Sequence, residues 1–241
     1  MTEPVQWLPD GSPHSPRFND RYRSRTGALA QSLTVFLGAS DLPQRWRGHE
    51  VFTVLETGFG LGLNFLTTWA AWELDAQRCE RLHFVSIEAY PVAPADILRN
   101  AQLPEAPGAT EPSLAARLPA LAQELAQAWH TLQPGPQQLH FASGRVCLTL
   151  ALGPVQPMLA QLDCVADAVY LDGFSPALNP DMWSFATLQA IERRCRPGTT
   201  LASYSVALAV RESLKQLGFS VRKCPGLPPK RHRLEALMLP K

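Results

Sequence analysis

The stretch that decides the fold class is Glu56-Thr57-Gly58-Phe59-Gly60-Leu61-Gly62-Leu63-Asn64-Phe65. It follows the apolar run 51–55, which predicts a buried strand, and it opens a helical pattern over residues 63–74. Glycines in such a turn allow positive φ and let a ligand approach the backbone, while the helix start offers free N–H groups. A tight strand-to-helix connection is the alternative interpretation. With both flanking elements and a strand-end acid present, we expect a nucleotide-like ligand here.

Strand and helix patterns alternate from this turn to the end of the chain. Apolar runs at 81–87, 168–171 and 200–205 predict strands, and residues 95–101, 119–132 and 180–195 predict helices, with Pro119 and Pro180 at first helical positions. Residues 139–141 and 146–152 predict a hairpin, and residues 220–223 and 235–239 predict a closing antiparallel hairpin. This alternation predicts an α/β fold with a mainly parallel sheet covered on both faces.

Residues 1–50 differ in character from residues 51–241. They are rich in Pro, Gly, Ser and Arg and contain one short amphipathic stretch at 27–37. We expect an N-terminal extension that wraps the domain of residues 51–241 and has no sheet of its own.

Composition narrows the class of protein. The 241 residues are 46% hydrophobic, enough for one sizeable core, and no stretch approaches the roughly 18 apolar residues of a membrane span. We expect a cytoplasmic protein. Five widely spaced cysteines without a Cys-x-x-Cys pair argue against a disulfide framework and against a structural zinc, and we expect no metal site. The net charge is +1, but three basic clusters at 17–25, 193–196 and 222–233 are compatible with a polyanionic partner as well as with solvated surface.

Acidic residues stand where three predicted strands end: Glu56, Glu88 and Asp172. Ligands of open α/β sheets bind at the carboxyl ends of the strands. Glu88 can accept hydrogen bonds from two ribose hydroxyls, because a carboxylate has two acceptor oxygens. Asp172 precedes Gly-Phe where a reacting group would approach, and it is our catalytic candidate. Strand capping is the alternative for Glu88, and helix capping by Asn179 accounts for part of the segment after Asp172.

These motifs together resemble the methyltransferase domain of the MnmC family, called MnmD when it stands alone. The resemblance implies a Rossmann-like class I fold with a seven-stranded sheet, in which a terminal hairpin is usual. It also implies S-adenosylmethionine as cofactor. The substrate it implies is the 5-aminomethyl group of 5-aminomethyl-2-thiouridine at the wobble position of the tRNA anticodon loop. The stretches that carry it are 18–24, 35–38, 42–46, 56–65, 82–88, 144–146, 148–150, 171–183, 210–211 and 218–219.

The resemblance also implies site residues. The expected cofactor contacts are Glu56, Gly58, Phe59, Gly60, Gly62, Asn64, Phe65, Glu88 and Asp172. The expected substrate contacts are Asp20, Tyr22, Phe174, Trp183, Lys230 and Arg231, with Phe174 and Trp183 stacking on the base. Bifunctional members carry a flavin-binding oxidase after this domain, and no such segment follows residue 239. We therefore expect the stand-alone form, with a separate flavin-dependent oxidase or other wobble-uridine pathway enzymes as possible partners.

The chain departs from the family pattern at several positions. Leu61 replaces a threonine, Pro154 replaces an acid expected to contact the adenine, and Leu178 replaces a lysine expected to contact substrate. The closing pattern is altered at residues 226–233. Two alternatives remain at this stage: an NAD-dependent oxidoreductase, against which the G-x-G-x-G spacing and the closing hairpin argue, and a non-catalytic tRNA-binding scaffold, against which the retained acids argue.

Overall fold

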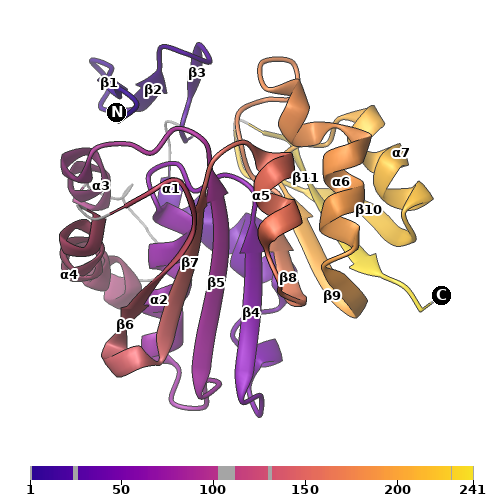
Figure 1. Cartoon of the computed structure of the whole chain (residues 1–241), viewed down its shortest axis with the longest axis horizontal. Coiled ribbons are helices and arrows are strands. Elements are labelled where there is room, and N and C mark those ends of the chain that lie inside the picture. Colours follow the sequence, from indigo (N-terminus) through magenta and orange to yellow (C-terminus); the bar gives the residue numbers. More distant parts are fainter. Residues whose placement is uncertain (1, 24–26, 103–111, 130–131, 229, 241) are drawn as a thin grey trace.

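A computed structural model describes residues 2–23, 27–102, 112–129, 132–228 and 230–240. In this part of the chain the central sheet has eight strands in the order β10-β11-β9-β8-β4-β5-β7-β6 (Figure 1). The five inner strands are parallel, and antiparallel pairs lie at both ends. The strands are β4 (Val51–Glu56), β5 (Arg81–Glu88), β6 (Gly135–Phe141), β7 (Val146–Leu152), β8 (Ala166–Tyr170), β9 (Cys195–Ser203), β10 (Phe219–Pro225) and β11 (His232–Met238).

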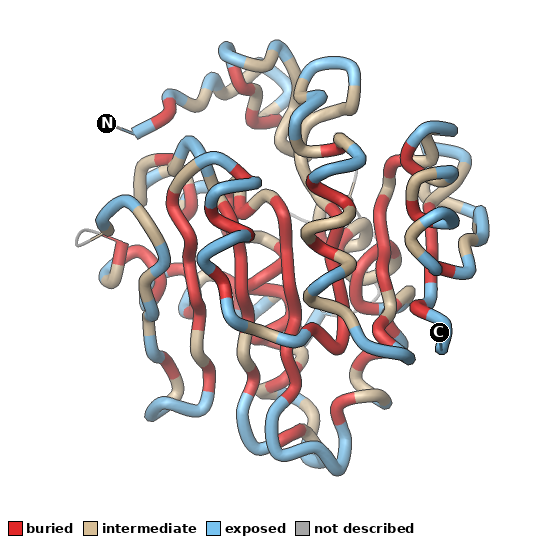
Figure 2. Tube along the Cα trace, turned by 45° about the vertical axis from the view of Figure 1, so that its right-hand side comes forward, coloured by how far each residue is buried: buried red, intermediate tan, exposed pale blue. Residues whose placement is uncertain are grey.

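Helices cover both faces of the sheet, and each inner strand therefore divides its apolar residues between two cores. Phe84 of β5 packs on the side of α2, whereas Val85 packs on the side of α5. Figure 2 shows the central strands buried along much of their length. This is why the inner strands read as continuous apolar runs in the sequence. One face carries α2 (Leu63–Leu74), α3 (Pro94–Ala101) and α4 (Pro112–Ala128); the other carries α5 (Val155–Gln161), α6 (Phe185–Glu192) and α7 (Leu208–Gln216).

The fold class and both predicted hairpins are confirmed, but three details differ. The sheet has eight strands rather than seven, because β6 joins β7 as an edge strand. Pro119 lies inside α4, not at its start. The helix predicted over 180–195 is two helices, a 3-10 turn at Pro180–Trp183 and then α6, because Ser184 adopts an extended conformation and caps α6 by accepting from the Thr187 N–H at 3.2 Å.

The N-terminal extension does have a sheet of its own, contrary to expectation. β1 (Gln6–Trp7), β2 (Pro13–Ser15) and β3 (Asp20–Arg21) pair antiparallel, and strands of two or three residues are too short to leave a periodic signal. The extension then forms α1 (Ala28–Gln31) and a π-helical segment η1 (Ser32–Leu37).

Contacts with the core hold this extension in place. The backbone of Glu3 forms an isolated parallel β-bridge with Val92. The Glu3 carboxylate accepts a hydrogen bond from the Arg17 side chain at 3.0 Å. Trp7 donates from its indole to Asp96 of α3 at 2.7 Å.

Three further features bear on the class of protein. All five cysteines are free thiols, as the sequence predicts. Within the described ranges, no helix is both long and apolar enough to cross a bilayer. The same residues contain no cluster of three or more His, Cys, Asp or Glu side chains placed to bind a metal ion.

Candidate active site

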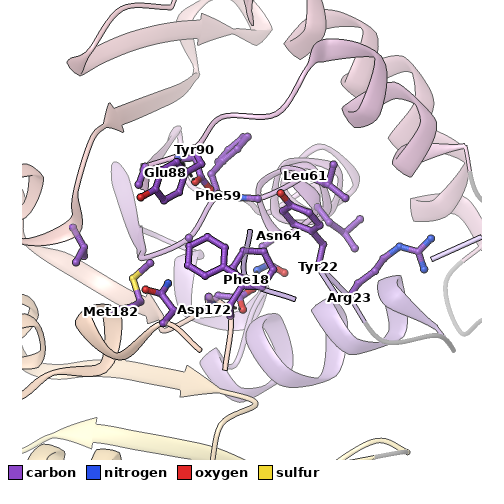
Figure 3. Close-up of a pocket in the computed structure, with 18 of the residues that line it drawn as sticks. Phe18, Tyr22, Arg23, Phe59, Leu61, Asn64, Glu88, Tyr90, Asp172 and Met182 are labelled. Atoms are coloured by element: carbon purple, nitrogen blue, oxygen red, sulfur yellow. Dashed lines mark hydrogen bonds between the residues drawn. The ribbon is translucent and has the colours of Figure 1, made fainter. Parts of the chain in front are cut away.

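A pocket of about 590 Å³ lies at the carboxyl ends of the parallel strands (Figure 3). This volume is within the range of small-molecule sites. The turn between β4 and α2 forms its floor, the ends of β5 and β8 contribute Glu88 and Asp172, and the N-terminal extension closes one side. The pocket therefore lies where open α/β sheets bind their ligands.

The glycine turn brings backbone close to the pocket wall. A Cβ on Gly58 would lie 3.2 Å from the Asp172 carbonyl oxygen, tighter than side chains normally pack. Gly60 has φ +54°, a conformation that L side chains rarely adopt, and a Cβ there would lie 3.4 Å from the Tyr22 ring. Glycine at these two positions keeps the turn narrow and leaves its backbone open to a ligand.

Glu88 fixes this turn from the neighbouring strand. One carboxylate oxygen accepts the Gly60 N–H and the other accepts the Tyr90 N–H, both at 2.8 Å. Burial raises the pKa of Glu88. Each oxygen has a second lone pair, and Glu88 lines the pocket, so the carboxylate can still accept hydroxyl hydrogen bonds from a ligand.

Asp172 is held rigidly at the other side of the floor. One carboxylate oxygen accepts the Gly173 N–H at 2.8 Å, and the other accepts the side-chain amide of Asn64 at 2.8 Å. Thr57 fixes the Asp172 backbone, donating to its carbonyl at 2.6 Å. Burial raises the pKa of Asp172 to about 6. At neutral pH the group is therefore mainly a carboxylate but titrates near the working range of a general base.

Glu56 lies behind Asp172 and is fully buried. It accepts from the Asn64 amide at 3.0 Å and from the Ser86 hydroxyl at 2.6 Å, and burial raises its pKa to about 8. Asn64 thus donates to two carboxyl groups, while its own oxygen accepts from Ser32 at 2.8 Å. This buried network ties η1, β4, α2 and the loop after β8 together beneath the pocket.

Aromatic side chains from the extension cover the pocket beside Asp172. The Phe18 ring stacks on Phe174 with centroids 4.5 Å apart, and it meets Tyr90 edge-on at 5.7 Å. Tyr22 also meets Phe174, at 5.0 Å. All four residues line the pocket. In Figure 3 the Phe18 ring lies between Glu88 and Asp172, and Tyr22 lies beside Leu61.

Comparison with known proteins identifies the family. Residues 116–239, more than half of the chain, match the model of a family described as S-adenosyl-L-methionine-dependent methyltransferase. The chain belongs to this family. Its cofactor is S-adenosylmethionine, and the nicotinamide alternative has no support.

Relatives and a solved structure extend the match to the whole chain. A protein of Paracidovorax citrulli named tRNA 5-methylaminomethyl-2-thiouridine biosynthesis bifunctional protein MnmC is 54% identical over 98% of this chain and 35% of its own length. The protein of that name from Delftia acidovorans is 51% identical over 100% of this chain and 36% of its own length. The chain thus spans about a third of these relatives. The crystal structure of MNMC2 from Aquifex aeolicus matches with a TM-score of 0.74 at 26% identity, covering 100% of this chain and 73% of that one.

The pocket of this methyltransferase fits the cofactor on its own geometry. The two glycines leave a backbone cradle that a Cβ would narrow, and Glu88 presents two acceptor oxygens at its edge. These groups suit the ribose and the adjoining part of a nucleoside ligand.

Most of the sequence-predicted cofactor residues gather at this pocket. Gly58, Phe59, Gly60, Asn64, Glu88 and Asp172 line it. Glu56 supports the floor from below, while Gly62 takes φ +72° at the start of α2 and lies against Phe59. Phe65 does not line the pocket, contrary to expectation. Its fully buried ring packs against Trp69 and Phe84 in the core, because the side chain one residue after Asn64 on a helix points about 100° away.

The predicted substrate residues divide in the same way. Tyr22 and Phe174 line the pocket, whereas Trp183 does not. Trp183 is 6% exposed, packs in the core beneath α6 and donates its indole N–H to the Phe174 carbonyl at 2.8 Å, so base stacking by Trp183 is not supported. Met182, its neighbour, lines the pocket instead.

Three polar candidates, Asp20, Lys230 and Arg231, are not among the residues that line the pocket. Asp20 accepts the Ser175 N–H at 3.1 Å and so joins the extension to the loop after Asp172. The Lys230 ammonium lies 3.7 Å from the centroid of the Tyr204 ring, and burial lowers its pKa. Tyr204 itself lines the pocket and donates to the Gly173 carbonyl. Arg231 is exposed on the surface.

Three of the positions that depart from the family pattern line the pocket. Leu61, Pro154 and Leu178 are among its lining residues, and Leu178 is 44% exposed. Sequence reasoning missed Phe18 as a site residue although it begins the stretch 18–24. It also missed Gln31 and Tyr204, for which the sequence has no local signal, because they reach the pocket only through the folded arrangement.

Proposed function

We propose that this methyltransferase methylates the exocyclic amine of 5-aminomethyl-2-thiouridine at the wobble position of tRNA. The observation that carries the proposal is the Asp172 carboxylate, oriented by Asn64 and Gly173 at the pocket floor. The names of the relatives, which cover the whole chain at about half identity, support this substrate. Enzymes that generate or further process the aminomethyl group, a flavin-dependent oxidase among them, are the corresponding partners.

Asp172 handles the proton of the acceptor amine. A primary alkylammonium cannot attack until it loses a proton, and Asp172, with a pKa of about 6, is ionised at neutral pH and can accept it. S-adenosylmethionine supplies an electrophilic methyl group when it is bound. Asn64 and Gly173 hold the Asp172 carboxylate in one orientation, so the proton and the nitrogen lone pair have fixed directions.

The aromatic cover offers a place for the base. A wobble base lies in a loop and can be splayed from the stack onto aromatic side chains. Phe174 and Phe18 form a stacked pair beside Asp172, with Tyr22 against Phe174. A base inserted at this cover would place its 5-substituent near Asp172 and would exclude water from the reacting groups.

Methyl transfer to undermodified tRNA tests the proposal. Wild-type protein, S-adenosylmethionine labelled in the methyl group and tRNA from a strain that accumulates the aminomethyl nucleoside should give labelled 5-methylaminomethyl-2-thiouridine. tRNA that lacks the aminomethyl group is the matched control and should stay unlabelled. Tight binding of both tRNAs with no label in either would instead support the scaffold alternative and overturn the proposal.

A further inference from the structure

One polar atom in the pocket wall has no partner within the described part of the chain. The side-chain oxygen of Gln31 is buried and accepts no hydrogen bond there. Gln31 is also one of the residues that line the pocket. A buried acceptor without a donor is unfavourable, and native proteins seldom retain one without a reason. The atom therefore marks a position at which a ligand can supply the missing donor.

The backbone holds Gln31 in this place. It ends α1, and its N–H donates to the Gly27 carbonyl at 2.8 Å. The next residue, Ser32, is buried and donates to Asn64 beneath the pocket. Ala28, Gln31, Ser32 and Phe36 all line the pocket, as expected for one face of a continuous helical segment. Gln31 thus belongs to a wall that is fixed to the same network as Asp172.

The charge of the surroundings indicates which donor fits. Glu88 and Asp172 line the same pocket, and Asp172 is mainly a carboxylate at neutral pH. A cationic donor suits these acids better than a neutral one, and an ammonium group forms stronger hydrogen bonds to a carbonyl oxygen than a neutral amide does. Both ligands of the proposed reaction carry a primary alkylammonium: the amino-acid part of the cofactor and the aminomethyl group of the acceptor nucleoside.

We infer that Gln31 is a binding residue whose carboxamide oxygen accepts a hydrogen bond from a primary alkylammonium group of the bound ligand, in the first place the α-ammonium of the cofactor. The aminomethyl group of the acceptor nucleoside is a second possible source of the ammonium group. Only this second possibility rests on the proposed function. The N-terminal extension therefore contributes to ligand recognition as well as covering the pocket.

Calorimetric binding separates the two sources without measuring turnover. The ligands are S-adenosylhomocysteine and its analogue with hydrogen in place of the α-amino group. The variants are Gln31→Leu, which removes the acceptor at similar volume, and Gln123→Leu, a control on the exposed side of α4. Gln31→Leu should weaken S-adenosylhomocysteine binding by about 10- to 100-fold, the loss of one charge-assisted hydrogen bond. The same substitution should leave the affinity for the deaminated analogue and the melting temperature of the protein nearly unchanged.

A second pair of measurements covers the acceptor. Binding of tRNA with and without the aminomethyl group is compared for the same variants, in the presence of saturating S-adenosylhomocysteine. A loss confined to the aminomethyl tRNA would support the inference with the acceptor as the ammonium source. Equal losses for S-adenosylhomocysteine and its deaminated analogue would overturn it, as would unchanged affinity for every ligand. Failure of wild-type protein to methylate tRNA while Gln31→Leu still weakens S-adenosylhomocysteine binding would reject only the proposed function.

Discussion

The side-chain amide of Asn64 donates a hydrogen bond to the Asp172 carboxylate at 2.8 Å, across the turn that forms the pocket floor. The same amide donates to Glu56 at 3.0 Å. A single side chain therefore links the catalytic candidate to a second buried carboxyl group. The protonation state of Asp172 depends on the hydrogen bond from Asn64, because a hydrogen bond to the charged form of an acid lowers the pKa of that acid.

Replacing Asn64 by leucine should raise the pKa of Asp172 further and slow methyl transfer at pH 7 by roughly tenfold, since one charge-assisted hydrogen bond to the carboxylate is lost. The pH profile of the single-turnover rate should move to higher pH. Ser32→Ala is the control, because it removes only the bond to the Asn64 oxygen. An unshifted profile in Asn64→Leu would show that this bond does not tune Asp172.

Lowering the pH should slow the wild-type enzyme through protonation of Asp172. Burial raises its pKa to about 6, so the base is present above that pH and is lost as the pH falls through it. Asp172→Asn keeps the shape of the side chain but removes the base. It should abolish this pH dependence and reduce the rate of methyl transfer by about 10²- to 10⁴-fold. Affinity for S-adenosylhomocysteine, measured by calorimetry, should remain near that of wild type. A rate independent of pH from 5 to 7 in wild type contradicts the assignment.

Glu56→Gln should stabilise the fold, and more so at high pH. The folded-state pKa of Glu56 is about 8, above its usual value, so between that usual value and 8 the folded protein binds a proton that the unfolded chain does not. Stability consequently falls as the pH rises through this window. Glutamine can keep both hydrogen bonds, accepting from Asn64 and donating to Ser86. The melting temperature should rise by roughly 2–8 °C at pH 8.5 and little at pH 4.5; an equal change at both would exclude Glu56 as the titrating group.

Glu88→Ala should weaken S-adenosylhomocysteine binding by at least about tenfold, because hydroxyl acceptors are lost and the Gly60 and Tyr90 N–H groups lose their partner. Glu88→Gln should have a smaller effect, since its oxygen retains one acceptor site. Calorimetry on both variants, with the exposed Glu80→Ala as control, measures the difference. Wild-type affinity in Glu88→Ala would rule out the ribose contact.

Leu178→Lys should tighten tRNA binding at low salt and steepen its salt dependence. Leu178 is 44% exposed and lines the pocket, so a lysine there can extend toward a phosphate without disturbing the core. One added phosphate contact should increase the slope of log affinity against log salt by somewhat less than one unit. Binding isotherms at several salt concentrations, beside a melting curve, measure this. An unchanged slope with a lowered melting temperature would assign Leu178 to packing.

The sequence alone determined the features that local pattern encodes. The glycine turn of residues 56–65, the two-sided apolar strands and the acids at the strand ends together specified an α/β fold and the side of the sheet that carries the pocket. The methyltransferase assignment rested on the family resemblance of these motifs in combination. Glu88 and Asp172 could be chosen because strand ends are readable from periodicity. Even so, the two- and three-residue strands of the extension left no such signal.

Only the tertiary structure decided which side chains face the pocket. Phe65 and Trp183 stand beside site residues in sequence but are turned into the core, whereas Phe18, Gln31 and Tyr204 reach the pocket from distant segments. The raised pKa values of Glu56 and Asp172 likewise arise from burial and from contacts across the fold. The physical reason is that side-chain direction and desolvation depend on packing between elements far apart in the chain, and a linear pattern does not specify that packing.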